Sequence, residues 1–388
     1  MASLLLPIIY LAFISLGLPD ALLGAAWPTM YPQLGAQVSW AGGVSMIISA
    51  CTILSALASD RLNERLGTGR VTAISVATTV AALFGFSFCH AFWQLCLWAI
   101  PYGLGAGSVD AALNNYVALH YKSRHMSWLH CMWGVGASLG PVIMGQALAG
   151  SGWQGGYRII GILQVVLTVV LLFSLPLWKL PQDAMGGAPF TPQHRSFPEL
   201  LKITGVPEVL VCFLCYCALE STAGMWASSY CTLVRGLDAQ TAASWASLFY
   251  LGITAGRFVS GFLTMKMSDR NMIRLGQVLI ALGILLVLLP AGNNVLFVGL
   301  ILIGLGCAPV YPCIIHETPV NFGRELSMSM TGLQMAFAYV GSCLAPPLFG
   351  LLAQNVTPRL YPWYLAVGLV VMVIMSESLH AKKAAEHR

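Results

Sequence analysis

Long apolar runs separated by short polar segments follow one another along nearly the whole chain. Most runs are about 20 residues long or longer, which is enough for a helix to cross a lipid bilayer. We therefore expect an all-α polytopic membrane protein with twelve transmembrane helices. The runs place these helices near residues 4–31, 38–59, 71–90, 93–119, 127–150, 157–178, 206–233, 240–264, 272–290, 294–315, 326–354 and 360–380.

The distribution of Lys and Arg predicts the orientation of the helices. With both termini placed in the cytoplasm, 15 basic residues lie on the cytoplasmic side, and Arg158, Arg235 and Arg359 lie outside. Cytoplasmic loops carry an excess of positive charge in membrane proteins. The connection 179–205 is the one long loop and contains four prolines. It predicts a flexible cytoplasmic linker between a six-helix bundle at 1–178 and a second one, with a short tail, at 206–388.

The two predicted bundles share sequence patterns. The motif S-D-R-x-x-x-R-L-G follows the second helix from Ser59 and follows the eighth from Ser268. Gly-Leu-Gly occurs at 103–105 in the fourth helix and at 304–306 in the tenth. Further echoes pair Gly136, Leu139 and Pro141 with Gly341, Leu344 and Pro346, and Asp20, Trp27 and Tyr31 with Glu220, Trp226 and Tyr230. Two parallel six-helix repeats resemble the major facilitator superfamily, whose binding site lies near the midplane of the membrane between the halves.

Composition excludes several classes of protein. Charged residues make up 9% of the chain and hydrophobic ones 57%, whereas a soluble domain carries about 25% charged residues. The net charge of +5 comes from basic residues in short loops, so we expect the lipid bilayer as a partner and no nucleic acid. The eleven cysteines lie mostly within apolar runs, where cysteine is a small membrane-compatible side chain. We expect no metal site, no cofactor and no enzymatic activity, because no nucleophile triad, metal cluster or phosphate-binding loop is evident.

Three acidic residues, Asp20, Asp110 and Glu220, lie within apolar runs. A charged side chain at the centre of a bilayer costs about 2.5–3.5 kcal/mol on insertion scales and usually marks a pathway. Asp20 follows Pro19, which can kink a helix. Burial disfavours the charged form of a carboxyl group, so Asp20 can exchange a proton. The alternative is that Asp20 is held in an ion pair with a basic residue. The proton-coupling candidates are therefore these three acids.

Asp110 and Asn114 are four residues apart and therefore share one face of a helix. Asn offers both donors and acceptors, which suits a polyhydroxylated ligand. The alternative is a hydrogen-bonded clamp between helices. Glycines at 103, 105 and 107 let neighbouring helices approach closely. Three roles are open for Glu220: a second proton site, an acceptor for a sugar hydroxyl group, or a buried hydrogen-bonded acid. For His130 the alternatives are contact with substrate or proton relay on one hand and a structural role on the other.

Aromatic and amide side chains complete the predicted binding site. Aromatic rings can stack on the C–H face of a sugar, although many such residues serve as interfacial or core residues instead. The substrate-binding candidates are Asp110, Asn114, Asn115, Trp27, Tyr31, His130, Trp133, Glu220, Trp226, Tyr230 and Gln334. The two S-D-R motifs suggest charge clusters that lock one conformation at the cytoplasmic face. The gating candidates are Asp60, Arg61, Arg65, Arg257, Asp269, Arg270 and Arg274.

Residues 105–114, GAGSVDAALN, resemble the fourth-helix segment of the fucose–galactose–glucose:proton symporter family, where an acid is followed four residues later by Asn. Asp20 falls where that family carries a first-helix Asp. The resemblance implies Asp20 as the main proton site and Asp110 as the link between proton and sugar. The fourth-helix acid is Asp here and usually Glu in the family. Residues 136–145, GASLGPVIMG, resemble instead the fifth-helix signature of proton-driven drug exporters, with Met144 in place of a glycine.

These features predict a monomeric, multi-pass transporter in the plasma membrane that imports a hexose or related sugar with protons. A proton-coupled exporter of drugs or metabolites and a sodium-coupled or uncoupled sugar carrier remain alternatives. A receptor or membrane enzyme is a further alternative without a supporting motif. Sequence does not identify the sugar, because the stereochemistry of hydroxyl groups is read by the placement of atoms.

Overall fold

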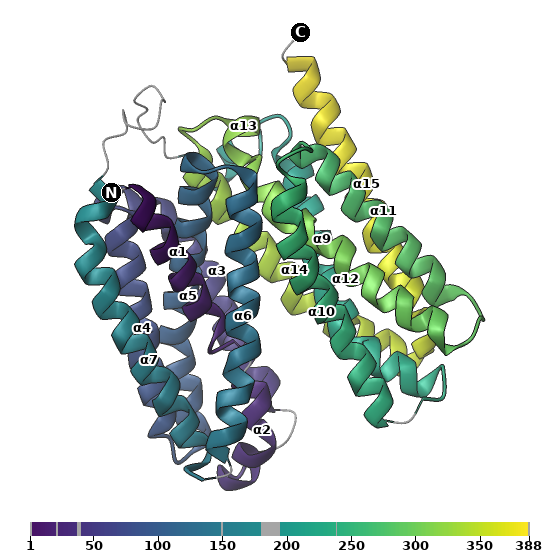
Figure 1. Ribbon diagram of the computed structural model, residues 1–388, viewed down its shortest axis with the longest axis horizontal. Helices are drawn as coiled ribbons and strands as arrows, with labels where there is room; N and C mark the ends of the chain where they lie inside the picture. Colours follow the sequence, from purple (N-terminus) through teal and green to yellow (C-terminus); the bar gives the residue numbers. More distant parts are fainter. Residues whose placement is uncertain are drawn as a thin grey trace. The chain divides into compact units, whose positions relative to one another are not determined.

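The computed structural model describes residues 2–20, 22–36, 40–148, 150–179, 195–237 and 239–386. Within these ranges the secondary structure is helical and contains no strand (Figure 1). The helices are α1 (Ala2–Gly17), α2 (Leu22–Gln33), α3 (Ala41–Leu66), α4 (Thr68–Ser87), α5 (Phe92–His120), α6 (Ser123–Leu148), α7 (Gly152–Ser174), η2 (Leu175–Lys179), α8 (Phe197–Leu200), α9 (Val206–Leu233), α10 (Ala239–Leu263), α11 (Asp269–Leu288), α12 (Asn293–His316), α13 (Thr318–Phe322), α14 (Ser327–Asn355), η4 (Pro358–Leu360) and α15 (Tyr361–Glu386).

Each predicted run of apolar residues coincides with one of these helices, and the first run is divided between α1 and α2. In the part of the chain that the structure describes, nine helices are long and apolar enough to cross a membrane, and Leu4–Gly17 and Leu248–Leu263 are shorter apolar helices. Many large apolar side chains are exposed, among them Phe173, at 83%. Such surfaces suit contact with lipid. The total of twelve spans and the side of each terminus stay predictions.

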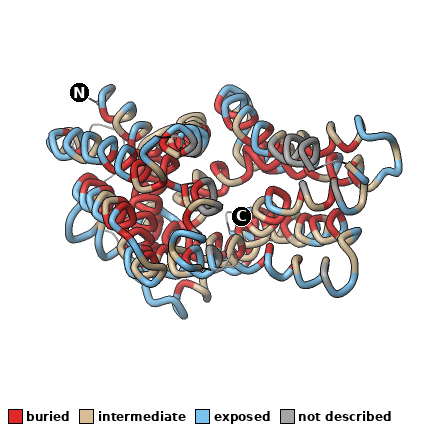
Figure 2. The backbone as a smooth tube through the Cα atoms, turned by 90° about the horizontal axis from the view of Figure 1, so that it is seen from below, coloured by how far each residue is buried: buried red, intermediate tan, exposed pale blue. Residues whose placement is uncertain are grey.

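The chain divides into two compact units. Unit 1 comprises Met1–His120, Leu129–His194 and Arg324–Ala336, and unit 2 comprises Tyr121–Trp128, Arg195–Gly323 and Phe337–Arg388. Helices α6 and α14 thus contribute residues to both units. In each unit the buried residues gather along the facing sides of the helices (Figure 2). The partition predicted at 178 and 206 stays a prediction, and residues 180–194 of the expected linker lie outside the described residues.

Glycines allow equivalent helices to pack closely in both units. A side chain on Gly103 would overlap the backbone of α3, and one on Gly304 would overlap the backbone of α10. Gly105 lies against α4 and Gly306 against α11 in the same way. The order α3, α4, α5 in unit 1 therefore corresponds to α10, α11, α12 in unit 2. This is the packing that the repeated Gly-Leu-Gly segments predicted.

The two copies of the S-D-R motif differ from the expected pair of loops. Residues 60–66 continue α3 as helix to Leu66, and Gly67 follows with a φ of 76°. The second copy begins with Ser268, whose side chain caps α11 by accepting a hydrogen bond from the backbone N–H of Asn271. The rest of this copy forms the first turns of α11. Both motifs are therefore largely helical. The helices extend beyond the predicted apolar runs because charged residues can continue a helix past the membrane, and hydropathy marks only the apolar part.

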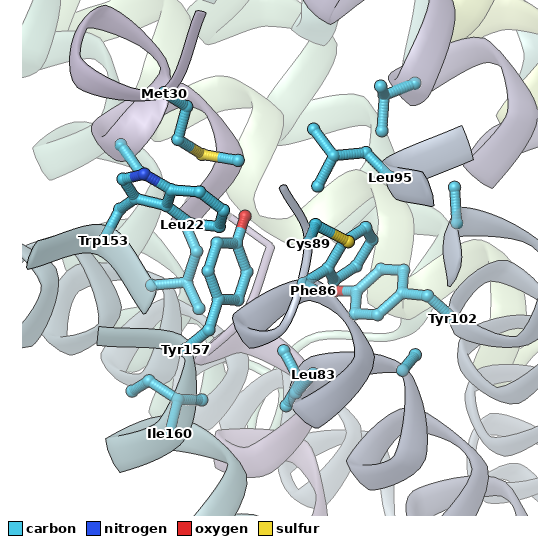
Figure 3. Packing of buried hydrophobic residues seen from close by; sticks show 14 of the residues in the cluster. Leu22, Met30, Leu83, Phe86, Cys89, Leu95, Tyr102, Trp153, Tyr157 and Ile160 are labelled. Carbon is cyan, nitrogen blue, oxygen red and sulfur yellow. The ribbon is translucent and has the colours of Figure 1, made fainter. Parts of the chain in front are cut away.

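Unit 1 has a core of buried side chains from α2, α4, α5 and α7. It includes Leu83, Phe86, Tyr102, Trp153 and Tyr157, and Figure 3 shows these side chains in one cluster. The Phe86 ring lies 5.3 Å from that of Tyr157 and 6.2 Å from that of Tyr102. This core positions α5, the helix that carries Asp110 and Asn114.

Candidate functional site

Asp20 lies in the break between α1 and α2. Its backbone forms a turn in which the Asp20 N–H donates to the Gly17 carbonyl and the Leu22 N–H donates to the Pro19 carbonyl. A proline lacks the N–H needed to continue a helix, so the predicted kink at Pro19 is confirmed. The interruption turns the Asp20 carboxylate toward α5 and α6.

Two neutral groups donate hydrogen bonds to this carboxylate. The Trp133 indole nitrogen on α6 lies 2.8 Å from Asp20 Oδ2, and the Tyr102 hydroxyl on α5 lies 3.2 Å from Oδ1. Tyr102 is 6% exposed, whereas Asp20 itself is exposed. The carboxylate is therefore bound from one side and accessible from the other.

Asp110, Asn114 and His130 form a buried chain of hydrogen bonds. The Asn114 amide nitrogen donates to Asp110 Oδ1 at 2.7 Å and to the Asp110 carbonyl at 2.9 Å. Asn114 Oδ1 lies 2.9 Å from His130 Nε2, which must donate because an amide oxygen only accepts. The exposed fractions are 5% for Asp110, 0% for Asn114 and 5% for His130. This series of hydrogen bonds ties α5 to α6 and links three of the expected polar residues in one network.

Asn115 and Gln334 also lie in unit 1. The amide oxygen of Asn115 accepts a hydrogen bond of 2.5 Å from the Ser327 hydroxyl on α14. Gln334 is completely buried on the same helix. Trp27 and Tyr31 belong to α2, but their side chains lie outside the described residues.

Glu220 in unit 2 has a cationic partner. Its Oε1 lies 3.3 Å from Nη2 of Arg257, and the side chains are 21% and 4% exposed, respectively. Arg257, which we expected in a cytoplasmic gating cluster, therefore pairs with the acid of α9 from its place on α10. Tyr216 and Tyr311 contribute further electrostatic interactions to this guanidinium.

The aromatic candidates of unit 2 are bonded to the backbone. The Trp226 indole donates to the Pro346 carbonyl at 2.9 Å, and the ring packs edge-on against Phe349. The Tyr230 hydroxyl donates to the Val287 carbonyl at 3.3 Å and is buried. These contacts support packing roles for both rings.

The S-D-R motifs contact the beginnings of two helices. In unit 1, Asp60 Oδ2 accepts a hydrogen bond of 2.9 Å from Ser329 near the start of α14. In unit 2, Asp269 accepts from Ser123 at the start of α6 and from His316 Nδ1 at 2.6 Å. The parallel suggests a shared function for the two aspartates.

The arginines of the two motifs differ in their surroundings. Arg270 and Arg274 both contact Glu377 of α15, at 3.4 Å and 2.5 Å. Arg61 and Arg65, the arginines of the first motif, are exposed. The second copy therefore carries an ion-pair cluster around Glu377.

Sequence reasoning missed Tyr102 and Glu377. Tyr102 precedes Asp110 by about two helical turns, so its position on the same side of α5 was a usable signal. Glu377 had no such signal, because its pairing with Arg274 depends on the packing of α15 against α11. Among the described residues, no group of three or more His, Cys, Asp and Glu side chains is placed to hold a metal ion.

Comparison with known proteins gives the family. The model of the Major Facilitator Superfamily matches residues 9–247 and 209–386. An uncharacterized transporter, y4wD, of Sinorhizobium fredii is 24% identical over 355 residues, 86% of each chain. A probable nitrate/nitrite antiporter, NarK1, of Thermus thermophilus is 26% identical, over 84% of this chain and 82% of that protein.

A solved structure has the same fold. The crystal structure of the E. coli fucose:proton symporter, FucP, superimposes with a TM-score of 0.76 at 16% identity, over 97% of each chain. These matches are to transporters and not to enzymes. The chain is thus a multi-pass membrane protein and secondary transporter of small molecules that belongs to the Major Facilitator Superfamily.

Proposed function

We propose that this chain is a proton-coupled symporter of the plasma membrane that carries a hexose or a related sugar by alternating access. The observation that carries the proposal is the environment of Asp20, whose carboxylate takes its hydrogen bonds from the neutral groups of Tyr102 and Trp133. A cationic partner would favour the charged form, whereas neutral donors leave both forms accessible. Proton coupling needs such a group, because one proton must bind and leave in each cycle.

The transport cycle follows from this change of charge. The Asp20 carboxylate binds a proton from the outer solution and becomes a neutral carboxylic acid. The loaded, neutral state changes conformation, and the acid releases its proton to the cytoplasm together with the sugar. Asp110 interacts electrostatically with Asp20 and is hydrogen-bonded to Asn114, so this pair supplies a route by which sugar binding affects the proton site.

The sugar assignment rests on the polar network of α5 and α6. Asn114, Asn115 and His130 offer donors and acceptors that match hydroxyl groups. These side chains are nearly completely buried, so sugar would contact them in another conformation of the transport cycle. The likeness in fold to a fucose:proton symporter supports the same class of substrate.

Transport by the purified protein tests the proposal. We expect proteoliposomes to accumulate one of L-fucose, D-galactose and D-glucose when the outside is more acidic than the inside, and to equilibrate it without a gradient. Accumulation that does not depend on the pH gradient would contradict proton coupling. A dependence on sodium at fixed pH would identify the sodium-coupled alternative. Absence of uptake for all hexoses would contradict the substrate.

A small organic or inorganic anion is the second candidate substrate. The buried guanidinium of Arg257 favours it, because Arg binds carboxylate and similar planar anions through paired donors. The relative named as a probable nitrate/nitrite antiporter supports this class. Uptake of nitrate or benzoate that is lost in Arg257→Gln, with no uptake of sugars, would favour the anion.

A further inference from the structure

The two donors to Asp20 each bind a different oxygen of one carboxylate. Trp133 donates to Oδ2 from α6 and Tyr102 donates to Oδ1 from α5. An ionised carboxylate only accepts hydrogen bonds, whereas a protonated one must use one oxygen as a donor. The arrangement therefore fits the charged form of Asp20 better than the neutral form.

Tyr102 is held rigidly in its position. Its side chain is 6% exposed and belongs to the core of unit 1, where the ring lies beside Phe86 (Figure 3). Tyr102 also borders a cavity of about 10 Å³, which Pro19, Thr79 and Ala106 help to line. A cavity of this size is at the lower limit of the space needed for one water molecule. Water from this side is therefore a poor replacement for the hydroxyl group.

Trp133 is positioned by close contact between α1 and α6. A side chain on Gly17 of α1 would overlap the Trp133 carbonyl oxygen, and one on Gly136 of α6 would overlap the Ile14 carbonyl oxygen. These reciprocal contacts bring the two backbones together. The distance between the indole and the carboxylate is therefore set by the backbone and not only by side-chain rotation.

The groups that act on Asp20 come from several helices. Helix α5 contributes Tyr102 and Asp110, which both interact with it electrostatically. Helix α6 contributes the indole of Trp133, which does not titrate, and holds His130 one turn earlier against Asn114. Tyr157 of α7 acts on Tyr102, whereas the groups that act on Asp20 itself are Trp133, Tyr102 and Asp110. Substitution of Tyr102 or Trp133 leaves Asp110, His130 and Tyr157 in the chain, so the contribution of each donor can be measured separately.

We propose that Tyr102 and Trp133 are positioning residues that set the pH at which Asp20 takes up the coupling proton. The inference rests on the proposed function, in which Asp20 is the proton site. Donors stabilise the ionised carboxylate, so removal of either one favours the neutral acid. The half-protonation point of Asp20 then moves to higher pH. Trp133 has the larger effect because its hydrogen bond is shorter.

Infrared difference titration of the purified full-length protein tests this. The protonated carboxyl group of Asp20 has a C=O stretching band, and the band that disappears in Asp20→Asn is assigned to it. We expect its midpoint to rise by about 1 pH unit in Trp133→Phe, the shift equivalent to the loss of one hydrogen bond to a charged group, and by less in Tyr102→Phe. Tyr157→Phe is the matched control from the same core, and its midpoint should equal that of the wild type.

The outcomes separate the inference from the function on which it rests. An Asp20 band whose midpoint is unchanged in both donor variants overturns the inference and leaves the proton site intact. A wild-type protein in which no band titrates and disappears in Asp20→Asn overturns both. Because the two variants act from different helices, one that does not fold leaves the other to decide the question. Hexose uptake at varied external pH gives a second readout and should show the same upward shifts.

Discussion

Two acids at related positions of the repeat, Asp20 in unit 1 and Glu220 in unit 2, have opposite surroundings. Asp20 is bonded to an indole and a phenol, both neutral. Glu220 is paired with the guanidinium of Arg257. A cation stabilises the ionised acid much more than a neutral donor does. An acid is therefore present in both units, with neutral hydrogen-bond donors in unit 1 and with an ion-pair partner in unit 2.

Under the proposed function, the two acids have different roles. In that proposal Asp20 binds and releases the proton, whereas the Glu220–Arg257 pair holds α9 against α10 or meets an anionic ligand. Each of the following predictions alters one unit and uses its counterpart in the other as a reference.

Removal of the carboxylate of Glu220 should have the largest effect on stability. The Glu220→Ala variant leaves Arg257, which is 4% exposed, without its ion-pair partner. Breaking a buried ion pair in this way costs about 3–5 kcal/mol, and replacement of both partners by apolar residues restores much of the loss. Thermal or denaturant unfolding in detergent measures the loss of stability. The double variant Glu220→Leu/Arg257→Met, which replaces both partners by apolar residues, is the comparison. Equal destabilisation by Asp20→Asn would contradict the distinction between the two acids.

Bulky substitutions at the equivalent glycines Gly136 and Gly341 should distinguish effects on helix packing from effects on proton coupling. A side chain on Gly136 would meet the backbone of α1, and one on Gly341 would meet that of α9. We expect Gly136→Val and Gly341→Val to destabilise the protein by similar amounts, about 1–3 kcal/mol each. Only Gly136→Val should also shift the pH dependence of uptake, since it displaces α6 and Trp133 from Asp20. A matching shift in Gly341→Val would show that the pH dependence does not come from the α1–α6 contact.

Replacement of Asp20 by Asn should abolish accumulation at little cost in stability. A gradient of one pH unit is worth about 1.4 kcal/mol per proton and can support an accumulation of about tenfold, which this variant should lose. Counterflow exchange of labelled for unlabelled sugar needs no net proton movement and should persist. Uptake and counterflow in the same vesicles make the comparison. Loss of both would assign Asp20 to substrate binding instead.

Much of the fold follows from local properties of the chain. The apolar runs predicted the helices because a helix in a bilayer must satisfy its backbone groups internally. The repeated Gly-Leu-Gly segments predicted close packing, and Gly103 and Gly304 have it against α3 and α10. The extension of α3 through residues 60–66 was missed, because hydropathy detects the membrane boundary and not the end of the helix.

The candidate site was predicted less completely. Asp110 and Asn114 were found together because they are one turn apart on a single helix. Tyr102 was missed, and Trp133 was expected to stack on a sugar, although its indole donates to Asp20. Arg257 was expected at a cytoplasmic gate and pairs with Glu220. In all three cases the partner lies on another helix, so the pairing depends on how each helix is rotated about its axis.

The amino-acid sequence alone is enough to identify a helical membrane protein with an internal repeat and with acids in apolar segments. Composition, periodicity and repeated motifs are properties of the chain that need no knowledge of its folding. The partners of the acids were decided only by the tertiary structure. A neutral indole at 2.8 Å from Asp20 and a guanidinium at 3.3 Å from Glu220 result from the packing of α6 against α1 and of α10 against α9. Since a carboxylate responds to the groups within hydrogen-bonding distance, that packing gives the two acids different environments, neutral donors around Asp20 and a cation beside Glu220.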